Sequence, residues 1–420
     1  LLLGPNTAEV LARLDPQMNL VEASDIIQEN IPSRMLESLF IHIIWGVTVG
    51  LIASGLTRRL GANYRCFRCD IEFSNHPTYL EHLEHVHKNP KNMKKILILG
   101  GGYAGINILK KIQSHFESNV EVGIELVSDS NFFLHTPMLP EMATGTIEPR
   151  HIATPIRNFC RRARFYQAKV SSIDLKSKKV VIRRHLDQKE KTLDYDYLVL
   201  ALGNQTNFFG NKNIEKYSFT IKSLDDAIKI RNHVISVLED ADQESDSEVQ
   251  SKLVTFVVVG GGFSGVETVG ELNDFVRDSC ERFYRNIAPE KIRVILVASG
   301  EQILHEIGNL GVHAKQTLQD SGVEIISKTK LEDATKDAVK LSNGDEIPYG
   351  TLIWAGGNKV DDVISSLDTE HHKNGSIIVD EYLRLQNNPV VFALGDCAYI
   401  VDSRTDKPYP ATAQHAIREA

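Results

Sequence analysis

Four residues in the first quarter of the chain have the types and spacing of zinc ligands. Two residues separate Cys66 from Cys69, twelve more lead to His82, and another four lead to His87. A hairpin followed by a short helix presents such a set tetrahedrally to the metal. We therefore expect a small ββα zinc finger over residues 64–87.

A single finger of this kind is a poor candidate for reading DNA. One finger covers only about 3 base pairs, and the acidic Glu81 and Glu84 lie on its expected helix, where they repel phosphate. The formal net charge of −8 also disfavours binding to nucleic acid. We expect a tether or docking module that meets lipid headgroups or a protein, with His85 able to replace His87 as a ligand.

Two glycine-rich turns have the spacing that binds the pyrophosphate of a dinucleotide. Each follows an apolar run and opens a helical stretch, in "ILILGGGYAG" and again in "FVVVGGGFSGVE" about 160 residues later. The glycines allow close backbone approach, and the free N–H groups of the helix stabilise the phosphates. Two copies predict two dinucleotides and an internal duplication. The motif residues are Gly100, Gly102 and Gly105 in the first copy and Gly260, Gly262 and Gly265 in the second.

Two dinucleotides in one chain indicate electron transfer from a nicotinamide to a flavin. The run "LVLALG" ends with Ala201 and Gly203, where the chain passes close to a cofactor. The run "VFALGD" ends with Gly395 and Asp396, and this carboxylate can hydrogen-bond a ribityl hydroxyl or orient groups around the pyrophosphate. Each of these features alone also fits a plain strand end.

The elements that must position these turns are short apolar runs that alternate with helical stretches from Lys95 onward. This pattern is typical of parallel sheets with crossover helices. At 420 residues, with 42% hydrophobic and 24% charged residues, the chain is long enough for two or three globular domains. We predict an α/β fold. The predicted buried strands are "KKILILGGG", "VEVGIELVS", "DYLVLALG", "TFVVVGGG", "IRVILVASG", "TLIWAGG" and "VVFALGD".

The segment before the finger contains an uncharged apolar run. "LFIHIIWGVTVGLIASGL" is about as long as a helix that spans a bilayer, which predicts a transmembrane helix over residues 39–57. Arginines follow it, so the positive-inside rule places the finger and everything after it on the cytoplasmic side of the cell membrane. His42 and Thr48 dilute the pattern, and a buried or interfacial helix is the alternative. Residues 1–38 stay unassigned.

Cysteine usage and an acidic run complete the chain-wide observations. Among the five cysteines, Cys160, Cys280 and Cys397 stand alone, a pattern that suits a reducing compartment and no disulfide framework. The acidic run "EDADQESDSE", residues 239–248, predicts a solvated hinge or domain boundary before the second glycine turn.

From Lys94 to the end the sequence resembles a type II NADH:quinone oxidoreductase, a single-chain respiratory flavoprotein that does not pump protons. The resemblance implies two Rossmann-like domains, with an FAD domain over 94–222 and 372–420 split by an NADH-binding domain over 223–371. The matching stretches are "GGGYAG", "FLHTPMLPEMATGTIEPR", "YDYLVLALGNQTNFFG", "FVVVGGGFSGVETVGEL", "TLIWAGG", "FALGDCA" and "YPATAQHAIREA".

The resemblance also implies roles for individual residues. The first glycine turn, Ala201, Gly203 and Asp396 would contact FAD, and the second turn would bind NADH. Glu267 would lie near the nicotinamide and the quinone pocket and relay protons to the quinol. The alternative for Glu267 is an acid favoured only by the helix dipole. Gln414 would begin the helix that points at the pyrimidine edge of the flavin.

The sequence departs from the family pattern in three places. Ser128 replaces the acid that binds the adenosine ribose of FAD, with Asp129 beside it. Ala298 replaces the corresponding acid for the nicotinamide dinucleotide, which leaves NADH and NADPH both open. The sequence also stops before the C-terminal membrane-binding region of the family, so we expect the quinone pocket to be incomplete.

Two other functions stay open at this stage. A sulfide:quinone reductase needs cysteines beside the flavin, for which Cys160 and Cys397 are the candidates; a disulfide reductase is disfavoured because the first unit lacks a CxxxxC pair. A membrane-tethered redox sensor or zinc-finger regulator would bind the nucleotides without turnover. The expected partners are NAD(P)H, a membrane quinone and the membrane itself, with a protein partner or a homodimer left open.

Overall fold

The structure, a computed structural model, describes residues 64–66, 71–73, 77–79, 81–82, 93–117, 119, 121–402, 404 and 407–420. The chain divides into two compact units, Leu1–His82 and Leu83–Ala420. The predicted membrane helix at 39–57 lies outside the described residues. None of the helices within the described ranges has the length and hydropathy of a membrane span.

The first unit contains a short hairpin. Strand β1 (Tyr64–Cys66) pairs antiparallel with β2 (Ile71–Phe73), and residues 77–79 and 81–82 are helical. This order matches the backbone of the predicted finger. No group of three metal-ligating side chains occurs among the residues that the structure describes. Because Cys69 and His87 lie outside those residues, zinc binding stays a prediction.

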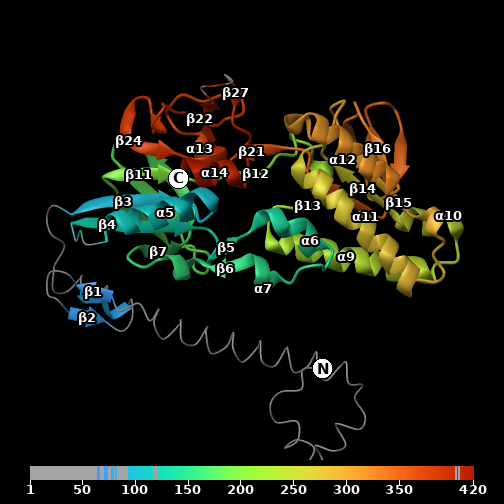
Figure 1. Cartoon of the computed structure of the whole chain (residues 1–420), viewed down its shortest axis with the longest axis horizontal. Coiled ribbons are helices and arrows are strands. Elements are labelled where there is room, and N and C mark those ends of the chain that lie inside the picture. The colour runs from blue at the N-terminus through green and yellow to red at the C-terminus, as the bar shows by residue number, and fades with distance from the viewer. Residues whose placement is uncertain are drawn as a thin grey trace, which may run out of the picture. The chain divides into compact units, whose positions relative to one another are not determined.

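The second unit is built on two parallel sheets (Figure 1). The first sheet has the order β23-β24-β11-β3-β4-β7 and is parallel except for β23, and all five strands of the second, β13-β20-β14-β15-β16, are parallel. The strands of the first sheet are β3 (Lys94–Leu99), β4 (Val122–Ser128), β7 (Arg164–Gln167), β11 (Tyr197–Leu200), β23 (Arg384–Leu385) and β24 (Asn388–Ala393). Those of the second are β13 (Phe219–Thr220), β14 (Thr255–Val259), β15 (Arg293–Val297), β16 (Val323–Ile326) and β20 (Thr351–Trp354). All seven predicted strands are present.

The two sheets are copies of one chain path, as the two glycine turns predict. Each path runs through three parallel strands and a three-stranded antiparallel sheet, and then returns to pair beside its first strand. The return strands β11 and β20 are followed by β12 (Asn204–Thr206) and β21 (Asn358–Val360), which pair with each other. The antiparallel sheets are β8 (Lys169–Asp174), β9 (Lys179–Arg183) and β10 (Glu190–Asp194), and β17 (Leu331–Ala334), β18 (Ala338–Leu341) and β19 (Glu346–Pro348).

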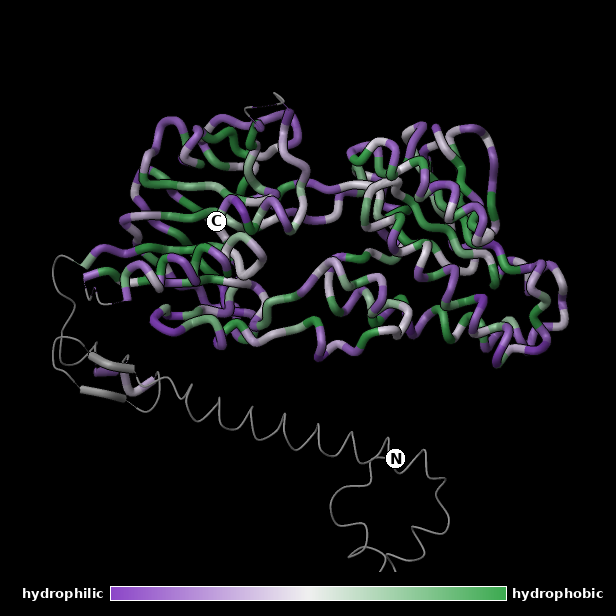
Figure 2. The backbone as a smooth tube through the Cα atoms, in the orientation of Figure 1, coloured by the Kyte–Doolittle hydropathy of each residue, from purple (hydrophilic) through white to green (hydrophobic). Residues whose placement is uncertain are grey.

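Both faces of each sheet are buried, which explains the uninterrupted apolar runs. In β3, Leu97 and Leu99 belong to one hydrophobic cluster and Ile96 and Ile98 to another, because successive side chains of a strand point to opposite faces. In the second sheet, β14 divides its side chains between two further clusters in the same way. Figure 2 shows the hydrophobic colour concentrated along these central strands.

Helices pack on one face of each sheet, and the three-stranded antiparallel sheet of the same chain path packs on the other. The helices are α5 (Tyr103–His115), α6 (Leu139–Ala143), α7 (Pro149–Ile152), α8 (Lys212–Tyr217), α9 (Leu224–Gln243), α10 (Ser247–Leu253), α11 (Phe263–Phe283), α12 (Asn309–Asp320), α13 (Asp362–Ser365) and α14 (Ala413–Glu419). The remaining short strands pair as β5 (Phe132–Leu134) with β6 (Ala153–Pro155), β22 (Ile377–Ile378) with β25 (Ala398–Tyr399), and β26 (Val401–Asp402) with β27 (Lys407–Pro408).

The hinge predicted at residues 239–248 is wrong. Helix α9 continues to Gln243 and α10 begins at Ser247, so only three residues join two helices. Gln250 Nε2 donates to Ala241 O at 2.9 Å, which holds the helices together. The acidic side chains lie on solvated helix surfaces, a pattern that composition alone does not separate from a loop.

Candidate functional site

The first glycine turn joins β3 to α5 beneath the return strand β11. Gly100 has φ +115°, and a Cβ atom there would lie 1.9 Å from Ala201 O. A Cβ on Gly105 would lie 1.9 Å from Gly100 O. Only glycine fits these two positions, and the turn is therefore locked tightly under the predicted cofactor residue Ala201.

The second glycine turn repeats this geometry between β14 and α11. Gly260 has φ +135°, and its Cβ would lie 2.5 Å from Ala355 O, the counterpart of Ala201. A Cβ on Gly265 would lie 2.0 Å from Gly260 O. The middle glycines differ from their neighbours, because a Cβ on Gly102 or Gly262 would meet nothing within 4 Å. Both turns thus present bare backbone to open space at the same point.

Helices α5 and α11 begin without a capping side chain. Their N-cap residues, Gly102 and Gly262, offer no side-chain acceptor, and neither helix has an acidic residue in its first turn. The first backbone bonds come from Ile106 and Val266, so the preceding amides are available to an anion. Five other helices of the unit have a capping side chain, whereas α6, α7 and α12 also have none. The five caps are Asn211, Ser223, Asp246, Asp361 and Thr412.

Asp396 lies at the carboxyl end of the first sheet, where ligands of parallel α/β proteins bind. It follows Gly395, whose backbone has φ +66° and whose Cβ would meet Ala104 in the first turn of α5 at 3.4 Å. Burial raises the pKa of the Asp396 carboxyl, while the charge of Lys222 and a hydrogen bond from Asn204 partly oppose that rise. The carboxylate lies just beyond the end of β24, as expected from the sequence, and its contact partners come from distant segments.

A chain of hydrogen bonds joins these three residues. Asn204 Nδ2 donates to Asp396 Oδ2 at 2.5 Å, and Lys222 Nζ donates to Asn204 Oδ1 at 2.7 Å. Asp396 Oδ1 accepts no hydrogen bond from the described residues, so it is available to a ligand hydroxyl. Neither Asn204 nor Lys222 was among the predicted site residues. Asn204 directly follows "LALG", a signal that could have found it, whereas nothing in the sequence links Lys222 to Asp396.

The residues of the first sheet fit FAD. Bare backbone at Gly102, uncapped amides of α5 and the free Oδ1 of Asp396 match a pyrophosphate and a ribityl hydroxyl in chemistry. Gly203 has φ +69° and open space around its Cβ position, so it too leaves room for a ligand. The second sheet offers the same backbone features at Gly262 but no carboxylate equivalent to Asp396, which suits a second, different dinucleotide.

Helix α14 packs against α5 and returns to the same region. Its predicted residue Gln414 is exposed in the first turn. At the other end of the helix, Glu419 Oε2 accepts the backbone N–H of Gly395 at 2.6 Å. Burial and the charge of Asp396 raise the pKa of Glu419. Glu419 was not predicted, because its role depends on the helix folding back onto the Gly395 turn.

The positions expected to bind adenosine ribose differ between the two sheets. Asp129 lies just beyond β4, its side chain is 66% exposed, and its Oδ1 lies 2.7 Å from His185 Nε2. Ser128 is buried beneath Gly101. In the second sheet Ala298 is likewise buried, beneath Gly261, and it places no carboxylate at the strand end. The choice between NADH and NADPH stays open on this geometry.

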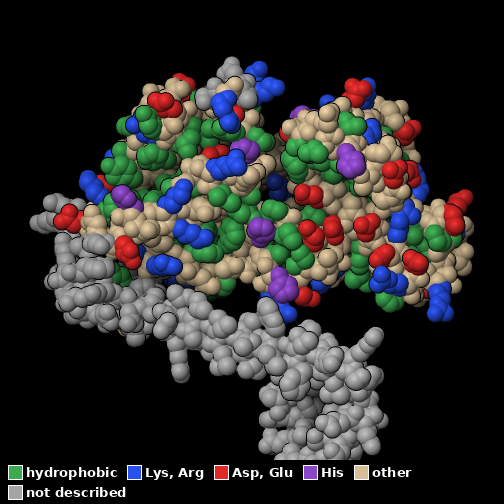
Figure 3. Space-filling model, viewed as in Figure 1, with side chains coloured by type: hydrophobic (Ala, Val, Ile, Leu, Met, Phe, Trp, Pro, Cys, Tyr) green, Lys and Arg blue, Asp and Glu red, His purple; other side chains and the backbone are tan. Residues whose placement is uncertain are grey.

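Glu267 belongs to a group of three carboxyl side chains where α6 and α11 pack together. Burial, and then the charge of Glu141 on α6, raise the pKa of Glu267. Glu141 Oε2 is buried without a hydrogen-bond partner among the described residues. Glu271 accepts hydrogen bonds from Thr144 and Thr146 at 3.3 and 3.4 Å. Figure 3 shows acidic side chains gathered over this region.

The position of Glu267 bears on its alternative explanation as an acid held by the helix dipole. Glu267 is the fifth residue of α11, and no acidic residue lies in the first turn. The dipole effect falls off beyond that turn. A carboxyl group whose pKa is raised beside a second carboxyl releases its proton at a higher pH than an ordinary glutamate, which suits a proton relay.

The isolated cysteines are inert by position. Cys160 and Cys397 are buried, and burial raises their pKa values to about 11 and about 12. Cys160 donates to Ile156 O, and Cys397 donates to Leu200 O and Leu394 O, in different hydrophobic clusters. Two such thiols do not form the cysteine pair that sulfide oxidation requires.

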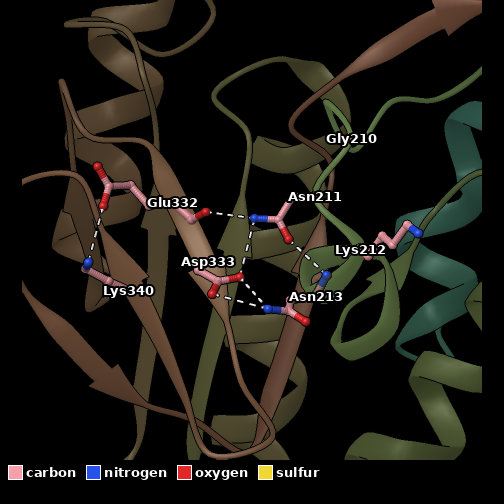
Figure 4. Close-up of a pocket in the computed structure, with 7 residues that line it drawn as sticks. All are labelled: Gly210, Asn211, Lys212, Asn213, Glu332, Asp333 and Lys340. Atoms are coloured by element: carbon pink, nitrogen blue, oxygen red, sulfur yellow. Dashed lines mark hydrogen bonds and ion pairs between the residues drawn. The ribbon is translucent and has the colours of Figure 1, made fainter.

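A separate polar pocket lies where the start of α8 meets β17 and β18 (Figure 4). Asn211 and Asn213 point toward Asp333: Asn213 Nδ2 donates to it at 3.0 Å, and Asn211 Nδ2 donates to Glu332 O at 2.8 Å. Lys212 points away from this group. Because the amide groups are used by protein partners, the pocket fixes α8 to the antiparallel sheet rather than offering a binding site.

A duplicated parallel fold with two uncapped glycine-turn helices defines the class of α/β proteins that bind two dinucleotides. The profile of the family described as "Pyridine nucleotide-disulphide oxidoreductase" (Pyr_redox_2) matches residues 94–420. A protein of Dictyostelium discoideum named "Probable NADH dehydrogenase" is 33% identical over 332 residues, which cover 78% of this chain and 72% of that protein. The chain belongs to this family, in its type II NADH dehydrogenase branch.

Two other relatives support the same branch, but the chain covers less than two thirds of their length. The "External alternative NADH-ubiquinone oxidoreductase, mitochondrial" of Yarrowia lipolytica is 31% identical, covering 81% of this chain but only 61% of that protein. NDH2 of Plasmodium falciparum, solved in complex with NADH, is 28% identical and superposes with a TM-score of 0.67. The superposition covers 73% of this chain and 65% of the Plasmodium chain. The sulfide:quinone oxidoreductase of Aquifex aeolicus, at 20% identity and a TM-score of 0.62, shares the fold.

Proposed function

We propose that this chain is a membrane-associated flavoprotein that passes a hydride from NAD(P)H to FAD and then two electrons to a quinone, without pumping protons. The observation that carries this proposal is the pair of uncapped glycine-turn helices, of which only the first is completed by the Asp396 carboxylate. The names of the relatives, which include NADH dehydrogenases and NADH-ubiquinone oxidoreductases, support the same chemistry.

In this proposal each cofactor has a set of binding residues in the chain. The backbone amides at the start of α5 bind the pyrophosphate of FAD, and Asp396 Oδ1 accepts a ribityl hydroxyl. The amides at the start of α11 bind the nicotinamide dinucleotide through the second turn. When bound, the flavin supplies the two-electron chemistry that no protein side chain offers. Asp129 and Gln414 keep their proposed places at the adenosine ribose and the flavin ring.

Glu267 would hold the proton that accompanies electron transfer to the quinone. Burial and the neighbouring Glu141 raise its pKa, which favours the protonated form relative to an ordinary glutamate. Thr144 and Thr146 fix Glu271 one helical turn away. The relay is therefore proposed as Glu267 with Glu141 as its partner.

We retain the finger and the membrane helix as parts of the proposal. Cys66, Cys69, His82 and His87 would bind zinc, and the hairpin β1–β2 followed by helical residues supports this order. The apolar run at 39–57 would attach the chain to a membrane, with the enzyme on the cytoplasmic side as the charge pattern predicts. The domain boundaries at 222/223 and 371/372 stay predictions as well.

The cofactor part of this proposal is tested by the composition of the purified chain. Absorbance spectroscopy and chromatography after denaturation should find one non-covalent FAD per chain, and metal analysis should find one zinc. A folded chain that neither contains FAD nor binds it on addition would contradict the proposal. Zinc and FAD are independent results, so the absence of one does not decide the other.

A further inference from the structure

Lys222 connects the two dinucleotide-binding sheets at the candidate flavin site. It follows β13, an edge strand of the second sheet, whereas Asn204 and Asp396 both lie at the carboxyl edge of the first. The Lys222–Asn204 hydrogen bond therefore joins the segment after an edge strand of the second sheet to the carboxyl edge of the first.

Local stability does not explain the course of the Lys222 side chain. Lys222 immediately precedes Ser223, the N-cap of α9, and a cation at the positive end of a helix dipole is unfavourable. Asp225 and Asp226 follow within four residues, yet the described contacts include no ion pair between Lys222 and either. The ammonium group reaches Asn204 instead.

The surrounding contacts hold Lys222 in this position. Its backbone N–H donates to Asp226 Oδ2 at 3.0 Å, the oxygen that also accepts the N–H of Ser223 in the capping box of α9. Desolvation lowers the pKa of Lys222, and the charge of Asp396 partly restores it. The ammonium group of Lys222 is thus committed to Asn204 and interacts with the charge of Asp396.

We propose that Lys222 is a positioning residue for the flavin: through Asn204 it orients the Asp396 carboxylate, and its positive charge favours the reduced, anionic flavin. This inference rests on the proposed function, because it requires FAD at Asp396. Hydride transfer breaks the C–H bond of the dihydronicotinamide, forms an N–H bond on the flavin, and leaves oxidised nicotinamide. The flavin gains two electrons and one proton, and therefore one negative charge.

The carboxylates nearby make this charge more important. Asp396 and Glu419 both face the Gly395 turn, and Asp396 itself raises the pKa of Glu419. The negative charge gained by a flavin bound at Asp396 would be repelled by these two acids, in a region that water only partly screens. Lys222 is the cation whose contacts reach this group through described hydrogen bonds, so it offsets that repulsion.

The test compares charge variants of the full-length chain by anaerobic spectroelectrochemistry of the bound flavin. Lys222→Met should bind reduced FAD about tenfold more weakly relative to oxidised FAD, which for a two-electron couple lowers the midpoint potential by about 30 mV. Lys222→Arg should keep the wild-type potential. The matched control is Lys229→Met, which should leave the potential unchanged. Lys229 is an exposed lysine on α9, and its ion pair among the described residues is with Asp225 at 3.9 Å.

The outcomes separate this inference from the proposed function. If the wild-type chain binds no FAD, the proposed function fails first. If Lys222→Met binds FAD with the wild-type potential, or if Lys229→Met lowers the potential equally, Lys222 has no such role. If Lys222→Met does not retain FAD, the test uses Lys222→Gln, which keeps a donor to Asn204 without the charge. Lys222→Gln must then show the same decrease in midpoint potential. A lower potential with an unchanged unfolding midpoint would exclude a merely structural effect.

Discussion

Gly102 and Gly262, the middle glycines of the two turns, allow a single-residue test of which sheet binds which cofactor. A side chain there would meet nothing within 4 Å in the protein, so valine should be accepted by the fold. Both residues also have extended backbone that valine adopts readily, with φ near −83° and −84°. We predict that Gly102→Val folds but binds FAD at least tenfold more weakly, by fluorescence titration of the apoprotein.

The second turn supplies the matched control. Gly262→Val should retain FAD and lose affinity for the nicotinamide dinucleotide, seen as a raised KM for NADH or weaker NADH binding by calorimetry. Loss of FAD in Gly262→Val would contradict the assignment of the nicotinamide dinucleotide to the second sheet. Normal FAD binding in Gly102→Val would contradict the assignment of FAD to the first sheet.

Glu267 tests the proposed proton relay. Glu267→Gln should leave FAD bound and lower turnover with quinone by about 10²-fold, the usual contribution of a positioned acid or base. Its rate should also lose the pH dependence that the carboxyl group gives the wild type. Glu281→Gln, an exposed residue of the same helix, is the control. Turnover that stays at the wild-type level across pH would rule the relay out.

Glu267 is also expected to affect the stability of the folded state, and Glu267→Gln should raise it at high pH. Because the pKa of Glu267 is raised in the folded chain, the folded state binds the proton more tightly than the unfolded state. Ionisation therefore costs stability as pH rises from the ordinary value through the raised one. Thermal unfolding should show that Glu267→Gln gains more in Tm at pH 8 than at pH 4. An equal gain at both pH values would contradict the raised pKa.

At the scale of elements, helix α9 depends on its capping box. Ser223 accepts the backbone N–H of Asp226 at 3.1 Å, and Asp226 accepts the N–H of Ser223 in return. Ser223→Ala should lower the free energy of unfolding by about 1 kcal/mol. Urea denaturation measures this change, and Ser236→Ala, in the exposed middle of α9, should cost less. A larger loss at Ser236 would show that the cap is not what starts the helix.

The sequence predicts elements better than contacts between them. The apolar runs became strands because both faces of each sheet are buried, and the glycine spacing located both turns. The hinge at 239–248 failed because an acidic helix surface and an acidic loop have the same composition. The Lys222, Asn204 and Asp396 chain lay beyond sequence analysis, since it joins segments that meet only when the two sheets assemble. The burial of Cys160 and Cys397 could likewise not be predicted from the sequence.

At the scale of the whole molecule, the family match and the second compact unit begin close together, at residue 94 and Leu83. We predict that a chain starting at Met93 keeps FAD and its reduction by NADH, and loses zinc. Metal analysis and absorbance spectroscopy check both results. Cys66→Ser in the full-length chain should lose zinc alone. Loss of FAD on removing residues 1–92 would show that the flavoprotein unit depends on them.

The central claim is that one chain carries electrons from a nicotinamide through a flavin to a quinone. An anaerobic titration of the FAD-loaded chain tests it most directly. The account predicts that one equivalent of NADH bleaches the visible absorbance of the flavin, that sulfide does not, and that a short-chain quinone restores it. A flavin that NADH leaves oxidised, or that sulfide reduces, would contradict the account.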